Sequence, residues 1–116
     1  MAESTDVTSR NDSGLGIVDV VGYINNVGGE KVVGACDELA TQGVSSFILN
    51  LEGCNIVNSI GVSFLIELVE KVQEERGRLA FCCASPTIAK TFRIMGLLQS
   101  STVHDTEAEA VASLRG

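Results

Sequence analysis

The sequence has no run of apolar residues close to the roughly 20 that a membrane-spanning helix needs. The stretch from Met1 to Asp6 lacks the basic and apolar segments that open a secretory signal. Positive charge is scarce, because eight Lys and Arg stand against 15 Asp and Glu, a net charge of −7. This surplus of negative charge disfavours binding to nucleic acid or to an anionic membrane surface. We therefore expect a cytoplasmic protein that neither inserts into a membrane nor binds nucleic acid.

Residues that would hold a metal or a nucleotide are also few. There is one histidine, His104, and no CxxC pair among the cysteines, which are Cys36, Cys54, Cys82 and Cys83. The cysteines are therefore expected to be reduced and buried, packing as small apolar side chains. The GxxxxGK[ST] spacing of a phosphate-binding loop is missing as well. These gaps predict a protein that binds no metal, needs no cofactor and is not an enzyme.

What the chain does contain is a regular alternation of strand and helix patterns. Its 116 residues, 45% of them hydrophobic, suffice for one domain with one core over residues 1–116. Strands are expected over residues 15–24, 45–51, 78–83 and 100–104. Helices are expected over residues 30–41, 59–76, 86–95 and 107–114. The alternation after residue 28 predicts an α/β fold whose neighbouring strands are parallel.

Residues 1–13 leave two alternatives open. Residues 3–10 could form an edge strand, because the segment from Asn11 to Gly14 is a good turn and would lead back into the strand at residue 15. Otherwise the segment is a loose tail.

Two glycine-containing segments give expectations about the first helix. The segment from Asn25 to Gly29 should separate the strand at residues 15–24 from the helix. Gly34 lies inside that helix, where glycine costs roughly 1 kcal/mol relative to alanine. We therefore expect Gly34 to mark a close approach to a neighbouring element.

The chain is organised around the stretch from Phe47 to Glu74. Residues 47–51 are almost wholly apolar, as in a strand covered on both faces, and a loop is expected over residues 52–57. Apolar residues then recur with helical spacing, at Val62, Leu65, Ile66, Leu68, Val69 and Val72. This pattern places Ser59 at the start of an amphipathic helix, just beyond the carboxyl end of a buried strand, which is where α/β proteins usually carry function.

Ser59 has a structural and a functional interpretation. A serine at a helix N-terminus usually only caps the helix, and Asn58 competes for that role. Alternatively, a phosphate on Ser59 would meet unpaired N–H groups and the positive end of the helix dipole. The fold would then tolerate the phosphate, whereas a docked partner would not. Phe64, one turn further on, either belongs to such an interface or packs against the neighbouring helix.

Three motifs in order resemble the STAS domain, in the form found in bacterial anti-sigma-factor antagonists. They are FILNLEGCNIVNSIGVSFLIEL from Phe47, GRLAFCCASP from Gly77 and KTFRIMGL from Lys90. The resemblance implies a single STAS-like domain, with a mixed sheet of four to five strands and about four helices mainly on one face. It also implies a non-catalytic switch that binds an anti-sigma factor, itself a serine kinase of the histidine-kinase-like ATPase fold.

The resemblance further implies how such a switch is operated. The kinase phosphorylates the residue that matches Ser59 and so ends the complex, and a metal-dependent PPM-type phosphatase removes the phosphate. The partner-binding residues that follow from the resemblance are Asn58, Ser59, Ile60, Gly61, Ser63 and Phe64. The sequence departs from the family pattern at Asn58, where an aspartate is common, and in residues 23–29, which lack the usual acidic turn.

Two other functions compete with this one. Related single-domain STAS proteins are accessory subunits of membrane lipid ABC transporters, on whose ATPase subunit they dock. A nucleotide or ligand sensor at the carboxyl ends of the strands is the third possibility, which the missing phosphate loop disfavours.

Overall fold

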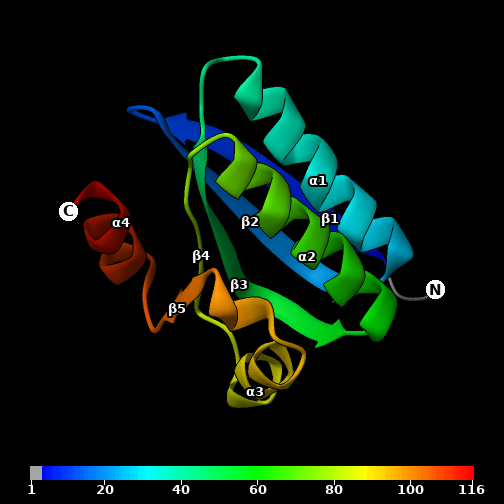
Figure 1. Ribbon diagram of the computed structural model, residues 1–116. Helices are drawn as coiled ribbons and strands as arrows, with labels where there is room; N and C mark the ends of the chain where they lie inside the picture. The colour runs from blue at the N-terminus through cyan, green and yellow to red at the C-terminus, as the bar shows by residue number, and fades with distance from the viewer. Residues whose placement is uncertain (1–3) are drawn as a thin grey trace.

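The computed structural model describes residues 4–116 as one five-stranded sheet with helices on both of its faces (Figure 1). The strands are β1 (Thr5–Asp12), β2 (Leu15–Ile24), β3 (Ser46–Val57), β4 (Leu79–Cys82) and β5 (Thr102–His104). The helices are α1 (Asn26–Ala40), α2 (Ser59–Glu74), α3 (Pro86–Ile94) and α4 (Glu107–Arg115), with a 3₁₀ turn η1 (Leu97–Gln99).

The strands lie in chain order across the sheet, and only β1 is antiparallel to its neighbour. The predicted α/β fold with a mixed sheet is therefore confirmed. The edge-strand alternative for the N-terminal segment also holds within the described residues, although the predicted start at residue 3 lies outside them. Ser13 and Gly14 form the turn of the β1–β2 hairpin. Their φ values of 53° and 91° are those of a two-residue turn between twisted strands.

The two faces of the sheet are covered unequally. Helices α1, α2 and α3 bury the larger apolar cluster on one face, where the rings of Phe81 and Phe92 lie 4.9 Å apart. Helix α4 covers part of the other face through Ala110, which packs with Ile17 and Ile48. The structure therefore confirms the prediction that the helices lie mainly on one face of the sheet.

Helix α1 begins four residues earlier than predicted, so the expected break at residues 25–29 is wrong. The side chain of Asn25 caps the helix by accepting a hydrogen bond from the N–H of Gly28 at 2.9 Å. Gly28 and Gly29 lie in the first turn of α1, and close packing explains why they are glycines: a Cβ on Gly28 would lie 2.3 Å from the carbonyl oxygen of Tyr23. The prediction for Gly34 is also wrong, since a Cβ there would meet nothing within 4 Å.

Strand β3 runs through the segment that was expected to be a loop. Its pairing with β2 continues from Asn50 to Val57, with two irregularities in register on the way. Residues 52–57 show no regular alternation of polar and apolar side chains, because the register irregularities interrupt the alternation of faces in this half of the strand. The predicted strand over residues 45–51 is therefore only the first half of β3.

Later elements match their predictions closely. Ser85 caps α3, as its position before Pro86 predicts, and Thr106 caps α4. All four cysteines are free, and three are buried, while Cys83 is half-buried. Cys83 follows the last residue of β4 and has a φ of 63°.

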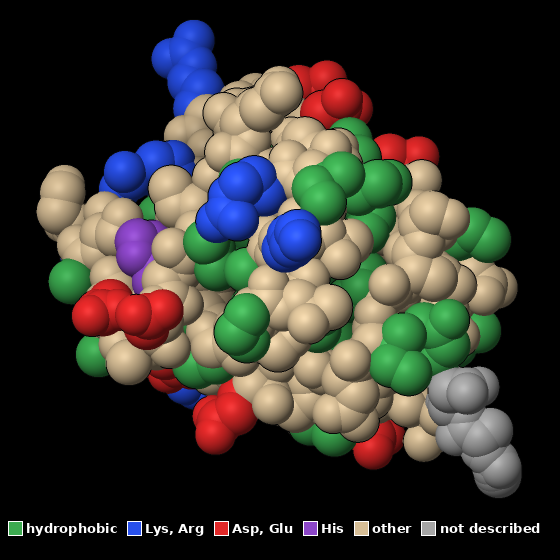
Figure 2. Space-filling model, turned by 90° about the horizontal axis from the view of Figure 1, so that it is seen from below, with side chains coloured by type: hydrophobic (Ala, Val, Ile, Leu, Met, Phe, Trp, Pro, Cys, Tyr) green, Lys and Arg blue, Asp and Glu red, His purple; other side chains and the backbone are tan. Residues whose placement is uncertain are grey.

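The surface around α3 differs from the rest of this acidic molecule. Figure 2 views the side on which α3 lies, and shows basic and apolar side chains in the middle of that face with carboxylates toward its rim. Within residues 4–116, no helix combines the length and apolar composition needed to cross a membrane.

Candidate functional site

The junction between β3 and α2 is built on Asn58. Its side-chain oxygen accepts a hydrogen bond from the N–H of Gly61 at 2.8 Å, so Asn58 is the N-cap of α2. Its backbone N–H donates to the carbonyl oxygen of Ile24 at 3.1 Å. Its side-chain amide reaches the hydroxyl of Tyr23 at 3.4 Å. Asn58 is therefore half-buried and tied to the carboxyl end of β2.

Because Asn58 supplies the cap, the hydroxyl of Ser59 is free. Ser59 is the first residue of α2, and its side chain is exposed to solvent. Among residues 4–116, neither the N–H of Ser59 nor that of Ile60 has a protein acceptor. The first turns of α1 and α2 carry no acidic residue. The surroundings of Ser59 therefore suit an added negative charge.

Gly61 and Phe64 serve the packing of α2. A Cβ on Gly61 would lie 2.0 Å from the carbonyl oxygen of Ile24, so only glycine fits where α2 meets β2. Phe64 is half-buried, and a Cβ on Gly29 would lie 2.8 Å from its ring. Phe64 was expected either to belong to a partner interface or to pack against the neighbouring helix. The structure has the second arrangement, with Phe64 against α1.

The other predicted site residues are on the surface. Ile60 is 54% exposed. Ser63 is exposed one turn beyond Ser59, and its hydroxyl donates to the carbonyl oxygen of Ser59 at 3.1 Å. The structure thus gathers Ser59, Ile60 and Ser63 on one exposed helix end, with Asn58, Gly61 and Phe64 beneath it.

The sequence reasoning missed further apolar side chains at this end of the sheet. Val27 in the first turn of α1 and Ile56 near the end of β3 are each 49% exposed, and Val21 of β2 is 53% exposed. Both helices begin at this end because α1 and α2 each follow one of two parallel strands. The sequence predicts a break at Val27 and a loop at Ile56, so their exposure at the same end of the sheet as Ser59 has no signal in the sequence.

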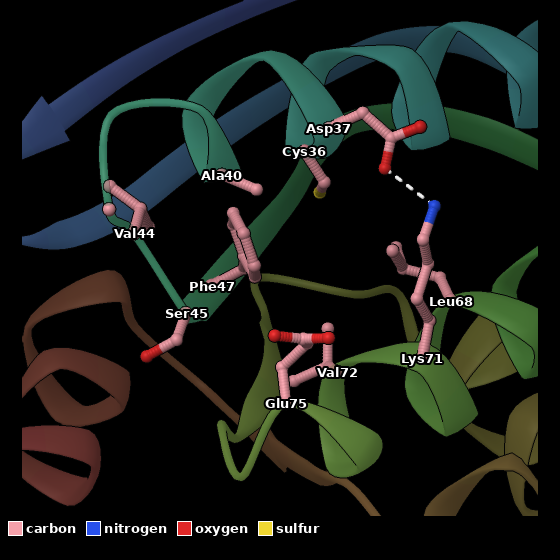
Figure 3. Close-up of a pocket in the computed structure, with 11 residues that line it drawn as sticks. Cys36, Asp37, Ala40, Val44, Ser45, Phe47, Leu68, Lys71, Val72 and Glu75 are labelled. Atoms are coloured by element: carbon pink, nitrogen blue, oxygen red, sulfur yellow. Dashed lines mark hydrogen bonds and ion pairs between the residues drawn. The ribbon is translucent and has the colours of Figure 1, made fainter.

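A separate hollow lies at the other end of α1 and α2 (Figure 3). Its volume is about 400 Å³, and its floor includes Val44, Phe47 and Val72. Lys71 of α2 forms an ion pair with Asp37 of α1 at 2.7 Å across its rim. Burial raises the pKa of the Cys36 thiol in this hollow to about 12, so the thiol is protonated at neutral pH.

Nothing in this hollow corresponds to a catalytic or metal-binding arrangement. Of its three charged residues, Asp37 and Lys71 form an ion pair and are about half exposed, and Glu75 is exposed. In the described part of the chain, no three His, Cys, Asp or Glu side chains converge in a way that could hold a metal ion. The surface around Ser59 is therefore the stronger candidate site.

Comparison with known proteins finds anti-sigma factor antagonists among the similar sequences and structures. An anti-sigma F factor antagonist of Lysinibacillus sphaericus is 27% identical over 101 residues, covering 86% of this chain and 86% of that protein. A solved anti-sigma factor antagonist from Mycobacterium paratuberculosis has a TM-score of 0.84 at 19% identity, covering 97% of this chain and 96% of that one.

The anti-sigma factor antagonist SpoIIAA has been solved in two forms. The unphosphorylated form has a TM-score of 0.76 at 22% identity, covering 96% of this chain and 99% of that one. The phosphorylated form, from Bacillus, has a TM-score of 0.71 at 21% identity, covering 95% of this chain and 98% of that one. At these identities the solved structures establish the shared fold.

The family itself is established by the sequence. The profile of the STAS domain matches residues 6–110, from the first strand to the buried face of α4. The matched residues include the whole β3–α2 junction and all three motifs on which the resemblance was based. The chain therefore belongs to the STAS domain family.

Proposed function

We propose that this protein is an anti-sigma-factor antagonist, a non-catalytic switch that phosphorylation of Ser59 turns off. In its unmodified form it binds an anti-sigma factor that is also a serine kinase of the histidine-kinase-like ATPase fold. A metal-dependent PPM-type phosphatase restores the binding form. The observation that carries the proposal is the exposed hydroxyl of Ser59 at the first position of α2, left free because Asn58 caps the helix.

The relatives support this assignment. The Lysinibacillus protein, which is similar over most of the chain, is named as an anti-sigma F factor antagonist. SpoIIAA, which shares the fold, has been solved in a phosphorylated form.

The geometry explains how one phosphate would act on binding and leave the fold intact. The unpaired N–H groups of Ser59 and Ile60 would face the phosphate, and the dipole of α2 favours negative charge at this end. A partner packed on the exposed side chains of Ile60 and Val27 would instead have to bury close to two negative charges. The phosphate is therefore expected to weaken the complex far more than it affects the domain.

Intact-mass measurement tests the modification. The protein is incubated with ATP and a histidine-kinase-like serine kinase from the same organism, and a gain of about 80 Da is expected, which reflects one phosphate. Ser59→Ala should remove the gain, while Ser63→Ala, one turn away, should retain it. A gain that persists in Ser59→Ala would place the phosphate elsewhere and contradict the proposal.

A binding measurement tests the repulsion. Ser59→Asp should leave the unfolding transition nearly unchanged and weaken binding to that kinase by at least about tenfold, equivalent to 1.4 kcal/mol. Ser45→Asp is the matched control, because Ser45 is exposed at the far end of the molecule and the charge change is the same. Equal affinities for the wild type and Ser59→Asp would rule out charge as the basis of the switch.

A further inference from the structure

The distribution of charge along the chain is strongly uneven. Between Arg76 and His104 there is no Asp or Glu, so all 15 carboxylate side chains lie outside this segment. The same segment holds four of the eight basic residues, and α3 lies in its middle. In a chain of net charge −7, this segment is a local region of positive charge.

The basic residues of α3 are available for binding. Lys90 and Arg93 are exposed, and neither forms an ion pair within the part of the chain that the structure describes. Three other basic side chains, those of Arg10, Lys71 and Arg115, do pair with carboxylates. Charges without a partner of their own are the ones that an incoming group can pair with.

Exposed apolar side chains adjoin these charges. Ile94, the last residue of α3, is 71% exposed, and Met95 is 42% exposed. Met95 follows the buried residues Ile88 and Phe92 at helical spacing, but α3 ends before it. Gly96, with a φ of 81°, turns the chain there. Single exposed apolar residues are ordinary, whereas two in sequence beside a groove are typical of an interaction site.

A groove of about 350 Å³ lies between α2 and this turn. Ile66 and Val69 of α2 line it on one side and Met95 and Leu97 on the other, together with the polar residues Gln73, Gln99 and Ser100. One carboxylate, that of Glu70, lies on the α2 wall. The groove therefore offers an apolar side chain contacts with Ile66 and Met95, and Met95 follows Arg93 of α3 by two residues.

We propose that Lys90, Arg93, Ile94, Met95 and this groove, here called the α3 surface, dock an acidic segment of a partner protein. Carboxylates of the segment pair with Lys90 and Arg93, and an adjacent apolar side chain enters the groove. The α3 surface does not include Ser59, so this binding is independent of the proposed switch. The middle of the face in Figure 2 has the basic and apolar character that such a segment requires.

Charge favours a protein partner over a lipid surface. Electrostatic binding to anionic membranes typically takes clusters of four to eight basic residues, and α3 offers two. The net charge of −7 also repels an extended anionic surface, whereas a short peptide contacts α3 alone.

A titration followed by NMR tests the proposal. The full-length ¹⁵N-labelled protein is titrated with a blocked 12-residue peptide of repeated Glu-Glu-Leu-Leu and, separately, with phosphatidylglycerol vesicles. The peptide should shift the amide signals of residues 90–97 and leave those of residues 58–61 in place. Raising the salt concentration from 50 to 500 mM should weaken this binding, because exposed charges are screened.

Two substitutions and a control decide the outcome. Arg93→Glu should weaken peptide binding about tenfold, and Ile94→Ser should weaken it several-fold, without changing the unfolding transition. Arg76→Glu is the control, because it makes the same charge change at an exposed residue outside α3. No binding, equal losses in Arg93→Glu and Arg76→Glu, or binding to the vesicles but not to the peptide would each overturn the proposal.

Discussion

The carbonyl oxygen of Ile24 and the Cα of Gly61 are so close that a Cβ on Gly61 would lie 2.0 Å from that oxygen. The same oxygen accepts the backbone N–H of Asn58 at 3.1 Å. The last residue of β2 thus fixes both the cap and the first turn of α2. Because Ser59 lies between these two contacts, its exposed position depends on a strand that ends 35 residues earlier in the chain.

Gly61→Ala is expected to destabilise the protein. The obstructing atom belongs to the backbone of β2, so no flexible side chain can move aside, and overpacking of this kind costs about 1–3 kcal/mol. Urea denaturation should show this loss in the free energy of unfolding. A variant as stable as the wild type would mean that α2 can shift away from β2 at no cost.

Gly34→Ala should have the opposite effect. Gly34 lies in the interior of α1, is exposed and has free space around its Cα. Alanine reduces the flexibility of the unfolded chain and is the better helix former, so a gain of about 0.5–1 kcal/mol is expected. The same denaturation experiment measures it, and a loss of stability would reveal a contact at this position that the structure does not contain.

Asn58→Ala should cost about 1 kcal/mol, because the N–H of Gly61 loses its acceptor. Asn58→Asp keeps the capping oxygen and should stay close to the wild type in stability. Thermal unfolding followed by circular dichroism distinguishes the two variants. Equal losses in both would show that the contact with Tyr23, which needs the amide, contributes more than the cap does.

The buried thiol of Cys36 should make stability fall at high pH. Burial, and to a lesser degree Asp37, raises its pKa from 9.0 to about 12. Between these values the unfolded chain has lost the proton and the folded chain keeps it, so the free energy of unfolding decreases as pH rises. The slope contributed by one such thiol approaches 1.4 kcal/mol per pH unit.

Cys36→Ala removes this contribution. Free energies of unfolding measured from pH 8 to 11 should therefore fall less steeply in the variant, whatever stability the substitution costs at neutral pH. Cys54, whose pKa burial raises to about 11, should keep part of the slope in both proteins. Identical slopes would mean that the Cys36 thiol is not retained in its protonated form on folding.

Local signals in the chain were sufficient for most of the elements. The cap at Ser85 and the apolar spacing of α2 depend on residues three or four positions apart, and both lie where expected. The sequence left the cap of α2 open between Asn58 and Ser59, and the structure has Asn58. The failures involve residues far apart. The pattern of Gly28 and Gly29 is typical of a helix break, but both lie within α1 and are glycines because Tyr23 and Phe64 leave no room for a Cβ.

For the candidate site, too, local sequence patterns determine some features and long-range contacts determine others. That a serine stands at the start of an amphipathic helix after a buried strand was determined by the sequence alone, since helix caps and apolar periodicity are local properties. Only the tertiary structure decided that Phe64 turns toward α1, that Val27 and Ile56 are exposed at the same end as Ser59, and that Met95 lies at the mouth of a groove. These positions follow from how parallel strands bring distant helix ends together, and no pattern within one segment records that pairing.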